Sequence, residues 1–143
     1  MVFILRKRLG SLRSIPTRYR ENDEYLLVDR FPDRAEETLS LIRSEGGEGL
    51  VYGADVSKDS ECAGMIKEAQ RAYGRIDILD NNVGISKRGT VLDVSEEEWD
   101  TVMEVNVKSI ALASRHAIPK MIETGGGSII NISSIAGIRA SGT

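Results

Sequence analysis

Short apolar runs alternate with longer stretches of helical periodicity along most of this sequence, and that alternation constrains its fold more than any other feature. The apolar runs predict four strands, at 25–28, 49–54, 76–79 and 128–132, and the stretches between them predict helices at 35–44, 57–73 and 95–122. Strands that are separated by helices are joined by right-handed crossovers and pair in parallel. The pattern therefore predicts an α/β fold with a doubly wound parallel sheet.

The predicted helices carry recognisable start and stop signals. Gly46 and Gly47 follow the first helix, where glycine is the usual stop. Ser57 is placed to cap the second helix. Ser95 and Glu98 have the spacing of a capping box, in which each residue bonds the backbone N–H of the other. These signals set the expected helix boundaries.

The composition indicates one globular domain over residues 1–143, with 41% hydrophobic and 29% charged residues. A lone cysteine, Cys62, excludes an internal disulfide and a cysteine metal site. No apolar run approaches the roughly 20 residues that span a membrane. We therefore expect no metal, no membrane association and a cytoplasmic location.

Charge is unevenly distributed along the chain. Residues 1–20 contain six basic and no acidic residues, whereas the other 123 contain 13 basic and 22 acidic residues. The basic segment is read as a frayed, solvated N-terminus, with an Arg-rich targeting peptide as the alternative. A nucleic-acid surface is disfavoured, because the segment lacks interleaved aromatic residues and a second basic cluster. We expect no nucleic-acid partner.

Polar residues follow the predicted strands at the points where those strands end. They are Asp29, Asp55, Asn81, Asn82, Ser133 and Ser134. The carboxyl ends of parallel strands meet at one edge of the sheet, and ligands bind there in open α/β folds. The sequence therefore predicts a ligand site at this edge.

Four motifs in this order resemble those of the short-chain dehydrogenase/reductase family. They are Asp55-Val56, Asn81-Asn82-Val83-Gly84, Glu104-Val105-Asn106-Val107 and Ser128-Ile129-Ile130-Asn131-Ile132-Ser133-Ser134. Each motif is weak by itself, but all four lie on the expected elements. The resemblance covers roughly residues 25 to 143, about the first half of a family member. It implies an incomplete Rossmann-type sheet and hydride transfer between a nicotinamide cofactor and a small alcohol or carbonyl substrate.

The resemblance implies a cofactor-binding role for several of these residues. Asp29 would accept hydrogen bonds from the adenine ribose hydroxyls, and its charge favours NAD over NADP, although Arg30 beside it opposes that preference. Asp55 would bond the adenine amino group, with Val56 along the ring. The alternative for either carboxylate is a structural role at a turn or a helix start. Two residues of the Asn-Asn turn would line the cofactor groove, namely Asn82 and Gly84.

Two residues are implied to take part in catalysis. Asn106 would hold a water molecule in the proton relay, and the alternative is a structural asparagine whose polar groups are satisfied. A polar residue at this position can hydrogen-bond within its helix or loosen the helix locally. Ser134 would orient the substrate carbonyl or hydroxyl. Asp80, in contrast, stands where the family usually has an apolar residue. The single histidine, His116, is predicted to lie on a helix surface rather than to act in catalysis.

The sequence departs from the family in two places that matter for chemistry. The family's proton donor, a Tyr with a Lys four residues later, would start at position 147, beyond Thr143. The first strand, if it is Val2-Phe3-Ile4, should end in a glycine-rich phosphate loop, but only Gly10 matches that pattern. Glycines are needed there so that backbone N–H groups can approach the pyrophosphate.

The function implied by the resemblance is therefore an NAD(P)-dependent oxidoreductase that is impaired in this chain. The alternative is a non-catalytic nucleotide-binding remnant, or an association partner of an intact relative. In the family the helix 96–122 packs in a subunit interface, so we expect a homo-oligomer or self-association. We expect Val102, Ile110, Ala113 and Ala117 to form the uncovered apolar stripe of that helix.

Overall fold

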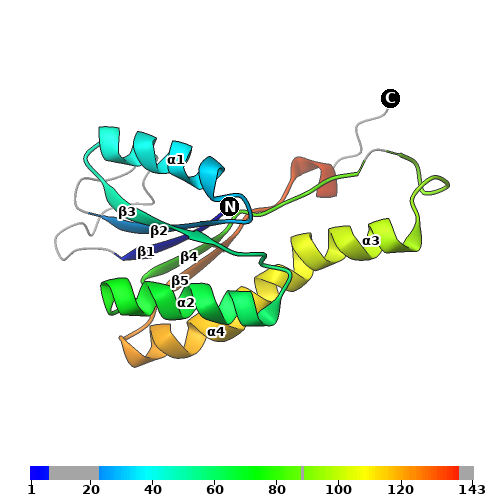
Figure 1. The fold of residues 1–143 in the computed structure, drawn as a ribbon. Coiled ribbons are helices and arrows are strands. Elements are labelled where there is room, and N and C mark those ends of the chain that lie inside the picture. Colours follow the sequence, from blue (N-terminus) through cyan, green and yellow to red (C-terminus); the bar gives the residue numbers. More distant parts are fainter. Residues whose placement is uncertain (7–22, 88, 139–143) are drawn as a thin grey trace.

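The computed structural model describes residues 1–6, 23–87 and 89–138, and its strands form one five-stranded sheet (Figure 1). The spatial order is β3-β2-β1-β4-β5. β2 pairs in parallel with β3, and β4 pairs in parallel with β5. The strands are β1 (Val2–Arg6), β2 (Glu24–Asp29), β3 (Glu48–Gly53), β4 (Ile78–Asn81) and β5 (Ser128–Asn131). The predicted α/β class is confirmed, and so are the four predicted strands, although the third begins and ends two residues later than predicted, at Ile78–Asn81.

The central strand β1 runs antiparallel to both of its neighbours. Val2 lies opposite Val28 of β2 and Asn81 of β4, whereas Arg6 lies opposite Glu24. The chain therefore enters the sheet at the edge where β2 and β4 end. The expectation of a wholly parallel sheet is wrong for this strand. Side chains alternate in the same way along parallel and antiparallel strands, so an apolar run predicts a strand without predicting its direction.

Helices cover both faces of the sheet (Figure 1). They are α1 (Pro32–Ser44), α2 (Asp59–Tyr73), α3 (Glu96–Met103), the π-helix η1 (Glu104–Lys108), α4 (Ser109–Glu123) and the short 3₁₀-helix η2 (Ile135–Gly137). α2 ends at Gly74, whose φ of 75° is the left-handed conformation that glycine adopts readily. The predicted capping box of Ser95 and Glu98 is present at α3. The predicted cap of α2 is wrong, because Lys58 is the N-cap residue and the Ser57 side chain bonds Asp55 instead.

The core lies in two layers, one on each face of the sheet. α2 and α4 cover the larger layer, which contains Met65, Leu79 and Ala117 among its fully buried residues. α1 covers the smaller layer, where Leu39 and Ile42 pack against Leu27.

The apolar stripe expected to be uncovered on the long helix is partly misplaced. Ala113 and Ala117 are buried in the layer between α4, α2 and the sheet. The exposed apolar residues follow a different line along α3, η1 and α4, with spacings that keep them on one side of a helix. We call these residues the outer stripe: Trp99, Met103, Val107, Ile118 and Ile122.

Within the described ranges, no helix is both long enough and apolar enough to cross a membrane.

Candidate cofactor and active site

Asp29 ends β2 at the edge of the sheet where the sequence predicts a ligand site. Its Oδ1 accepts a hydrogen bond from the Phe31 N–H at 2.8 Å, which fixes the turn into α1. Its Oδ2 lies 3.7 Å from the amino nitrogen of Met1, which β1 brings to this edge. Burial lowers the pKa of that amino group, and the Asp29 charge opposes the shift. The Asp29 carboxylate thus has a structural bond on one oxygen and a cation near the other.

Asp55 follows β3 and belongs to a tight local turn. Its Oδ1 accepts hydrogen bonds from both the backbone N–H and the hydroxyl of Ser57, at 3.1 and 2.7 Å. The Ser57 hydroxyl holds the pKa of the Asp55 carboxyl below its usual value, and burial opposes the shift. Val56 is 6% exposed and packs in the larger core layer. Its side chain is therefore part of the core, and its carbonyl oxygen accepts a hydrogen bond from the buried Cys62 Sγ at 3.2 Å.

Two guanidinium groups flank an exposed aromatic ring beside Asp29. The guanidinium carbon of Arg34 lies 4.9 Å from the centre of the Phe31 ring, and that of Arg30 lies 5.9 Å from it. Phe31 is 53% exposed. Contacts of this kind hold a cation over an aromatic face. Two guanidinium groups therefore lie near the Asp29 carboxylate, and only one of them, that of Arg30, was expected from the sequence.

The Asn-Asn turn after β4 ties that strand to β5 through its first asparagine. Asn81 is buried, and its Nδ2 donates to Oδ1 of Asn131 at 2.9 Å. Asn82 is exposed. A Cβ added to Gly84 would lie 3.9 Å from Asn106 Oδ1, an ordinary contact distance. The sequence predicts the site at Asn82 and Gly84 and does not reveal the Asn81–Asn131 pair, whose two asparagines end the observed strands β4 and β5.

Asn106 lies at the centre of the π-helix η1 and holds the loop after β4. Its Oδ1 accepts from the Ile85 N–H and its Nδ2 donates to the Ile85 carbonyl, both at 2.8 Å. The Ser109 N–H reaches back to the Glu104 carbonyl, one residue further than in an α-helix. Of the two effects expected of a polar residue here, a hydrogen bond within the helix or a local loosening, the structure shows the loosening. Each polar group of the side chain makes one bond to the Ile85 backbone, which leaves one acceptor position and one N–H free for a water molecule.

Ser134 follows β5 at the same edge of the sheet and is exposed. Its Oγ accepts a hydrogen bond from the Ala136 N–H at 3.2 Å and so caps η2. The hydroxyl proton makes no hydrogen bond to a residue in the described ranges. That proton is therefore available to a carbonyl oxygen bound at this edge.

The residues present fit the adenosine part of a dinucleotide better than its pyrophosphate. Asp29 and Asp55 lie at neighbouring strand ends and offer carboxylate oxygens suited to ribose hydroxyls and an amino group. β1, however, leaves the sheet at the opposite edge, where Arg6 pairs with Glu24. A phosphate loop that followed β1 directly would therefore start away from the site. Gly10, predicted as its glycine, lies outside the described residues.

Comparison with known proteins identifies the family. The family described as short chain dehydrogenase matches residues 16–142. An uncharacterized oxidoreductase of Thermotoga maritima is 43% identical over 106 residues, which are 74% of this chain and 41% of that protein. A 3-oxoacyl-[acyl-carrier-protein] reductase of Staphylococcus epidermidis is 36% identical over 105 residues, 73% of this chain and 43% of that protein. The chain belongs to the short-chain dehydrogenase/reductase family.

Solved structures agree with this assignment. A short-chain dehydrogenase/reductase from Burkholderia xenovorans superposes with a TM-score of 0.78 at 33% identity, over 82% of this chain and 47% of that one. A short-chain alcohol dehydrogenase from Sinorhizobium meliloti gives a TM-score of 0.74 at 29% identity, with coverage of 82% and 46%. The chain thus spans less than half the length of each of these four relatives.

Proposed function

We propose that this chain is the nucleotide-binding part of an NAD(P)-dependent oxidoreductase that acts on an alcohol or carbonyl substrate. One observation supports this most strongly: Asp29, Asp55, the Asn106–Ile85 clamp and Ser134 all lie at or beside the carboxyl ends of parallel strands. In an open α/β sheet this edge is where ligands bind. The family to which the chain belongs supplies the reaction class.

Each residue of the candidate site would have a separate role in binding the cofactor or the substrate. Asp29 would accept hydrogen bonds from the ribose hydroxyls, and Asp55 would bond the adenine amino group. The Asn106–Ile85 clamp would hold the loop after β4 against the long helix. Ser134 would donate its free hydroxyl proton to the substrate oxygen. A bound nicotinamide supplies the hydride in this class of reaction.

Catalysis by these 143 residues is proposed to be impaired. None of the four tyrosines, at 19, 25, 52 and 73, has a lysine four residues later. General acid/base groups contribute typically about 10²–10⁴-fold to a rate. The reversed β1 favours the second candidate function, a non-catalytic remnant or an association partner of an intact relative, because it removes the phosphate loop from its usual starting point.

We propose that NAD is preferred over NADP, on the basis of the Asp29 charge. A carboxylate that accepts ribose hydroxyls repels a 2′-phosphate, although Arg30 and Arg34 lie close by. We expect Asp29→Asn to weaken NAD binding by about tenfold or more, because hydrogen bonds to charged groups contribute roughly 1.5–3 kcal/mol. NADP binding should change little or improve. Calorimetric titration of the 143-residue chain with each dinucleotide measures both effects.

Asparagine keeps an acceptor for the Phe31 N–H, so this substitution removes charge and leaves the turn bond in place. Asp33→Asn, on the exposed first turn of α1, is the matched control and should leave both affinities unchanged. Tighter binding of NADP than of NAD to the unmutated chain would contradict the cofactor preference. Binding of neither dinucleotide would contradict the proposed nucleotide-binding function.

We also propose that the chain associates with itself through the outer stripe. The residues of this stripe are between 40% and 72% exposed, although each is large and apolar. Large apolar side chains that are exposed on one side of a helix are characteristic of protein interfaces. We expect the sedimentation coefficient to rise with chain concentration, and Ile118→Glu to reduce that rise. Leu41→Glu, at a 62% exposed site on α1, is the control and should leave the rise of the sedimentation coefficient unchanged. A monomer at every concentration would refute the proposal.

A further inference from the structure

A cavity of about 380 Å³ lies between the C-terminal parts of α2 and α4, away from the candidate cofactor site. The residues that border it precede Gly74 and Thr124, which lead to the amino ends of β4 and β5. The candidate cofactor residues follow the carboxyl ends of the strands. A ligand in this cavity would therefore occupy a separate place on the molecule. The lining consists of Ala63, Ile66, Lys67, Gln70 and Arg71 from α2, with His116 and Lys120 from α4.

The lining contains cationic or titratable nitrogen groups and no acidic side chain, in a chain whose net charge is −3. Lys67 makes no hydrogen bond or ion pair with any residue in the described ranges. The other three groups are paired with carboxylates outside the lining. Arg71 bonds Glu68 at 2.6 Å, Lys120 bonds Glu123 at 2.8 Å, and His116 lies 2.8 Å from Asp59.

These pairs are exposed, and exposed pairs are weak. The Arg71 and Lys120 side chains are 70% and 40% exposed, and Asp59 is 49% exposed. Lys120 and Arg71 also pair within their own helices, through residues three positions away. An anion in the cavity can therefore replace the carboxylates as partners of these cations at a small cost in free energy, because the carboxylates are then solvated by water.

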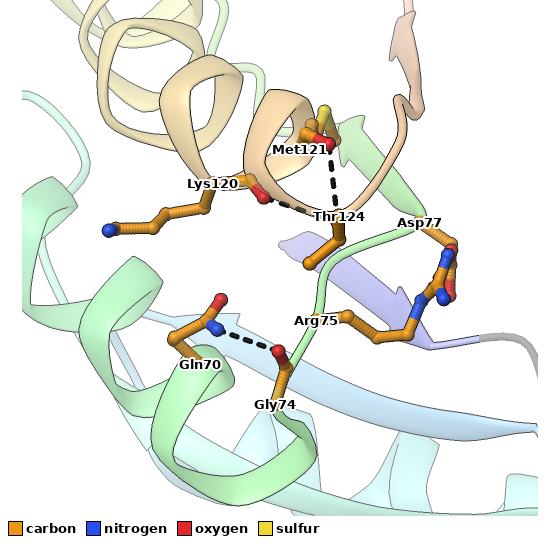
Figure 2. A network of polar contacts seen from close by, with 7 residues as sticks. All are labelled: Gln70, Gly74, Arg75, Asp77, Lys120, Met121 and Thr124. Carbon is orange, nitrogen blue, oxygen red and sulfur yellow. Dashed lines mark hydrogen bonds and ion pairs between the residues drawn. The ribbon is translucent and has the colours of Figure 1, made fainter.

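Gln70 gives the cavity a second, independent feature. Its Nε2 donates to the Gly74 carbonyl at 2.6 Å, but its Oε1 is buried and lacks a donor among the described residues. Figure 2 shows the Gln70 side chain directed from α2 into the gap between the helices, with Lys120 on the other side. A buried acceptor without a donor is unfavourable and rare in native proteins. A ligand that carries a hydroxyl group would supply the missing donor.

We propose that this cavity binds a small phosphate monoester that carries a hydroxyl group, such as a sugar phosphate. Lys67, Lys120 and Arg71 would contact the phosphate oxygens, because charge-assisted bonds to phosphate are the strong ones available to these side chains. The ligand hydroxyl would donate to Gln70 Oε1, and its carbon skeleton would rest on Ala63 and Ile66. A dianion matches a lining with several cations better than a carboxylate does.

The test uses the single histidine of the chain as a reporter inside the cavity. The imidazole Cε1–H signal of His116 is followed by NMR in the 143-residue chain during titration with ribose 5-phosphate at constant ionic strength. Inorganic phosphate, sulfate and ribose are titrated in parallel. We expect a saturable shift with ribose 5-phosphate, a weaker one with inorganic phosphate, and none with ribose.

Matched variants separate the cavity from general charge effects. The double variant Lys67→Gln/Lys120→Gln should weaken ribose 5-phosphate binding by at least about tenfold, since it removes two charge-assisted contacts. Lys87→Gln/Lys108→Gln, which removes two exposed lysines elsewhere, should leave the affinity unchanged. Gln70→Leu should reduce the affinity for ribose 5-phosphate to that for inorganic phosphate. Amide spectra verify that each variant retains the fold.

Three results would overturn the proposal. One is the lack of a saturable shift with ribose 5-phosphate, and another is equal weakening by the two double variants. The third is a shift with sulfate as large as that with ribose 5-phosphate, which would indicate a bulk ionic effect. None of these results depends on whether NAD binds at the carboxyl edge.

Discussion

The two faces of the sheet differ in how completely they are covered. On one face α2 and α4 lie side by side, and the layer beneath them includes residues from every helix and strand that borders it. On the other face α1 lies over β2 and β3, and in the described part of the chain no helix lies over β4 and β5 (Figure 1). The face under α2 and α4, which we call the covered face, is therefore packed along its whole width. The other face is packed against a helix only over β2 and β3.

This difference indicates where the fold obtains its stability. Residues from β4 contribute to both faces, because successive side chains on a strand point to opposite sides. Leu79 faces the α2–α4 layer and is fully buried, whereas Ile130 on the neighbouring strand is only partly buried on the opposite face. Gross stabilisation from burial scales with apolar area removed from water. The two faces should therefore respond unequally to the same kind of substitution.

The largest expected effect comes from truncating side chains on the two faces. Leu79→Ala should lower the free energy of unfolding by roughly 2–5 kcal/mol, since it leaves a cavity in a closed layer. Ile130→Ala should cost roughly half of that or less, because its side chain already contacts water. Urea unfolding followed by circular dichroism measures both values. Equal losses would mean that the face over β4 and β5 is as well packed as the other.

A smaller effect is expected at Asp80, a carboxylate on the same side of β4 as Ile78. Its Oδ1 is buried and lacks a partner among the described residues. Burial raises the pKa of the Asp80 carboxyl, and the nearby terminal amino group opposes the shift. The folded chain therefore holds this proton more tightly than the unfolded chain does. Between the unfolded and folded pKa values, stability falls as the pH rises.

Asp80→Asn removes this penalty. The stability of the variant relative to the unmutated chain should be highest near neutral pH and should decline as the pH falls toward about 4, the ordinary pKa of an aspartate. Unfolding measured at several pH values tests the slope. Asp55→Asn is the opposite case, because its folded pKa is lowered. The unmutated chain should be more stable than Asp55→Asn near neutral pH, and this difference in unfolding free energy should shrink as the pH falls. A flat difference for Asp80→Asn would show that its carboxylate is well solvated.

The smallest expected effect concerns the polar contact that joins the two helices on the α2–α4 face of the sheet. His116 Nε2 lies 2.8 Å from Asp59 Oδ1, so the pair bridges α4 and α2. Both side chains contact solvent, and such pairs contribute about 0–1 kcal/mol. His116→Gln should therefore change the unfolding free energy by no more than this amount. A loss as large as that of Leu79→Ala would mean that this face is held by polar contacts rather than by burial.

The sequence was sufficient to predict the strands and the helices, because these follow from apolar periodicity. It also predicted that the candidate site residues gather at one edge of the sheet, because they follow the strand ends. It could not predict the direction of β1, since Val2 to Arg6 alternate identically either way. It also misplaced the exposed stripe of α4. Ala113 and Ala117 are buried because their small side chains let α4 approach α2 closely. Apolar periodicity does not distinguish such small residues from large ones.

Roles inside the site were harder to predict than its location. Asn81, Asn82 and Asn131 are alike as residues, and only the pairing of β4 with β5 decides which two meet. Val56 was expected along a ligand ring, but it packs in the core because α2 begins three residues later. The Asn106–Ile85 clamp joins residues 21 positions apart, and no local pattern reveals it.

The π turn at η1 has a consequence for insertions and deletions in this helix. A π turn accommodates one residue more than the α-helical turns around it, and each α-helical residue advances the helix by about 100°. If η1 became α-helical at constant length, α4 would turn by about that angle and carry Ala113 and Ala117 away from α2. A deletion of one residue within 104–108 would instead preserve their orientation while removing the bulge around Asn106. The packing of α4 against α2 should therefore survive the loss of one residue from η1, but it should not survive the conversion of η1 to an α-helix of the same length.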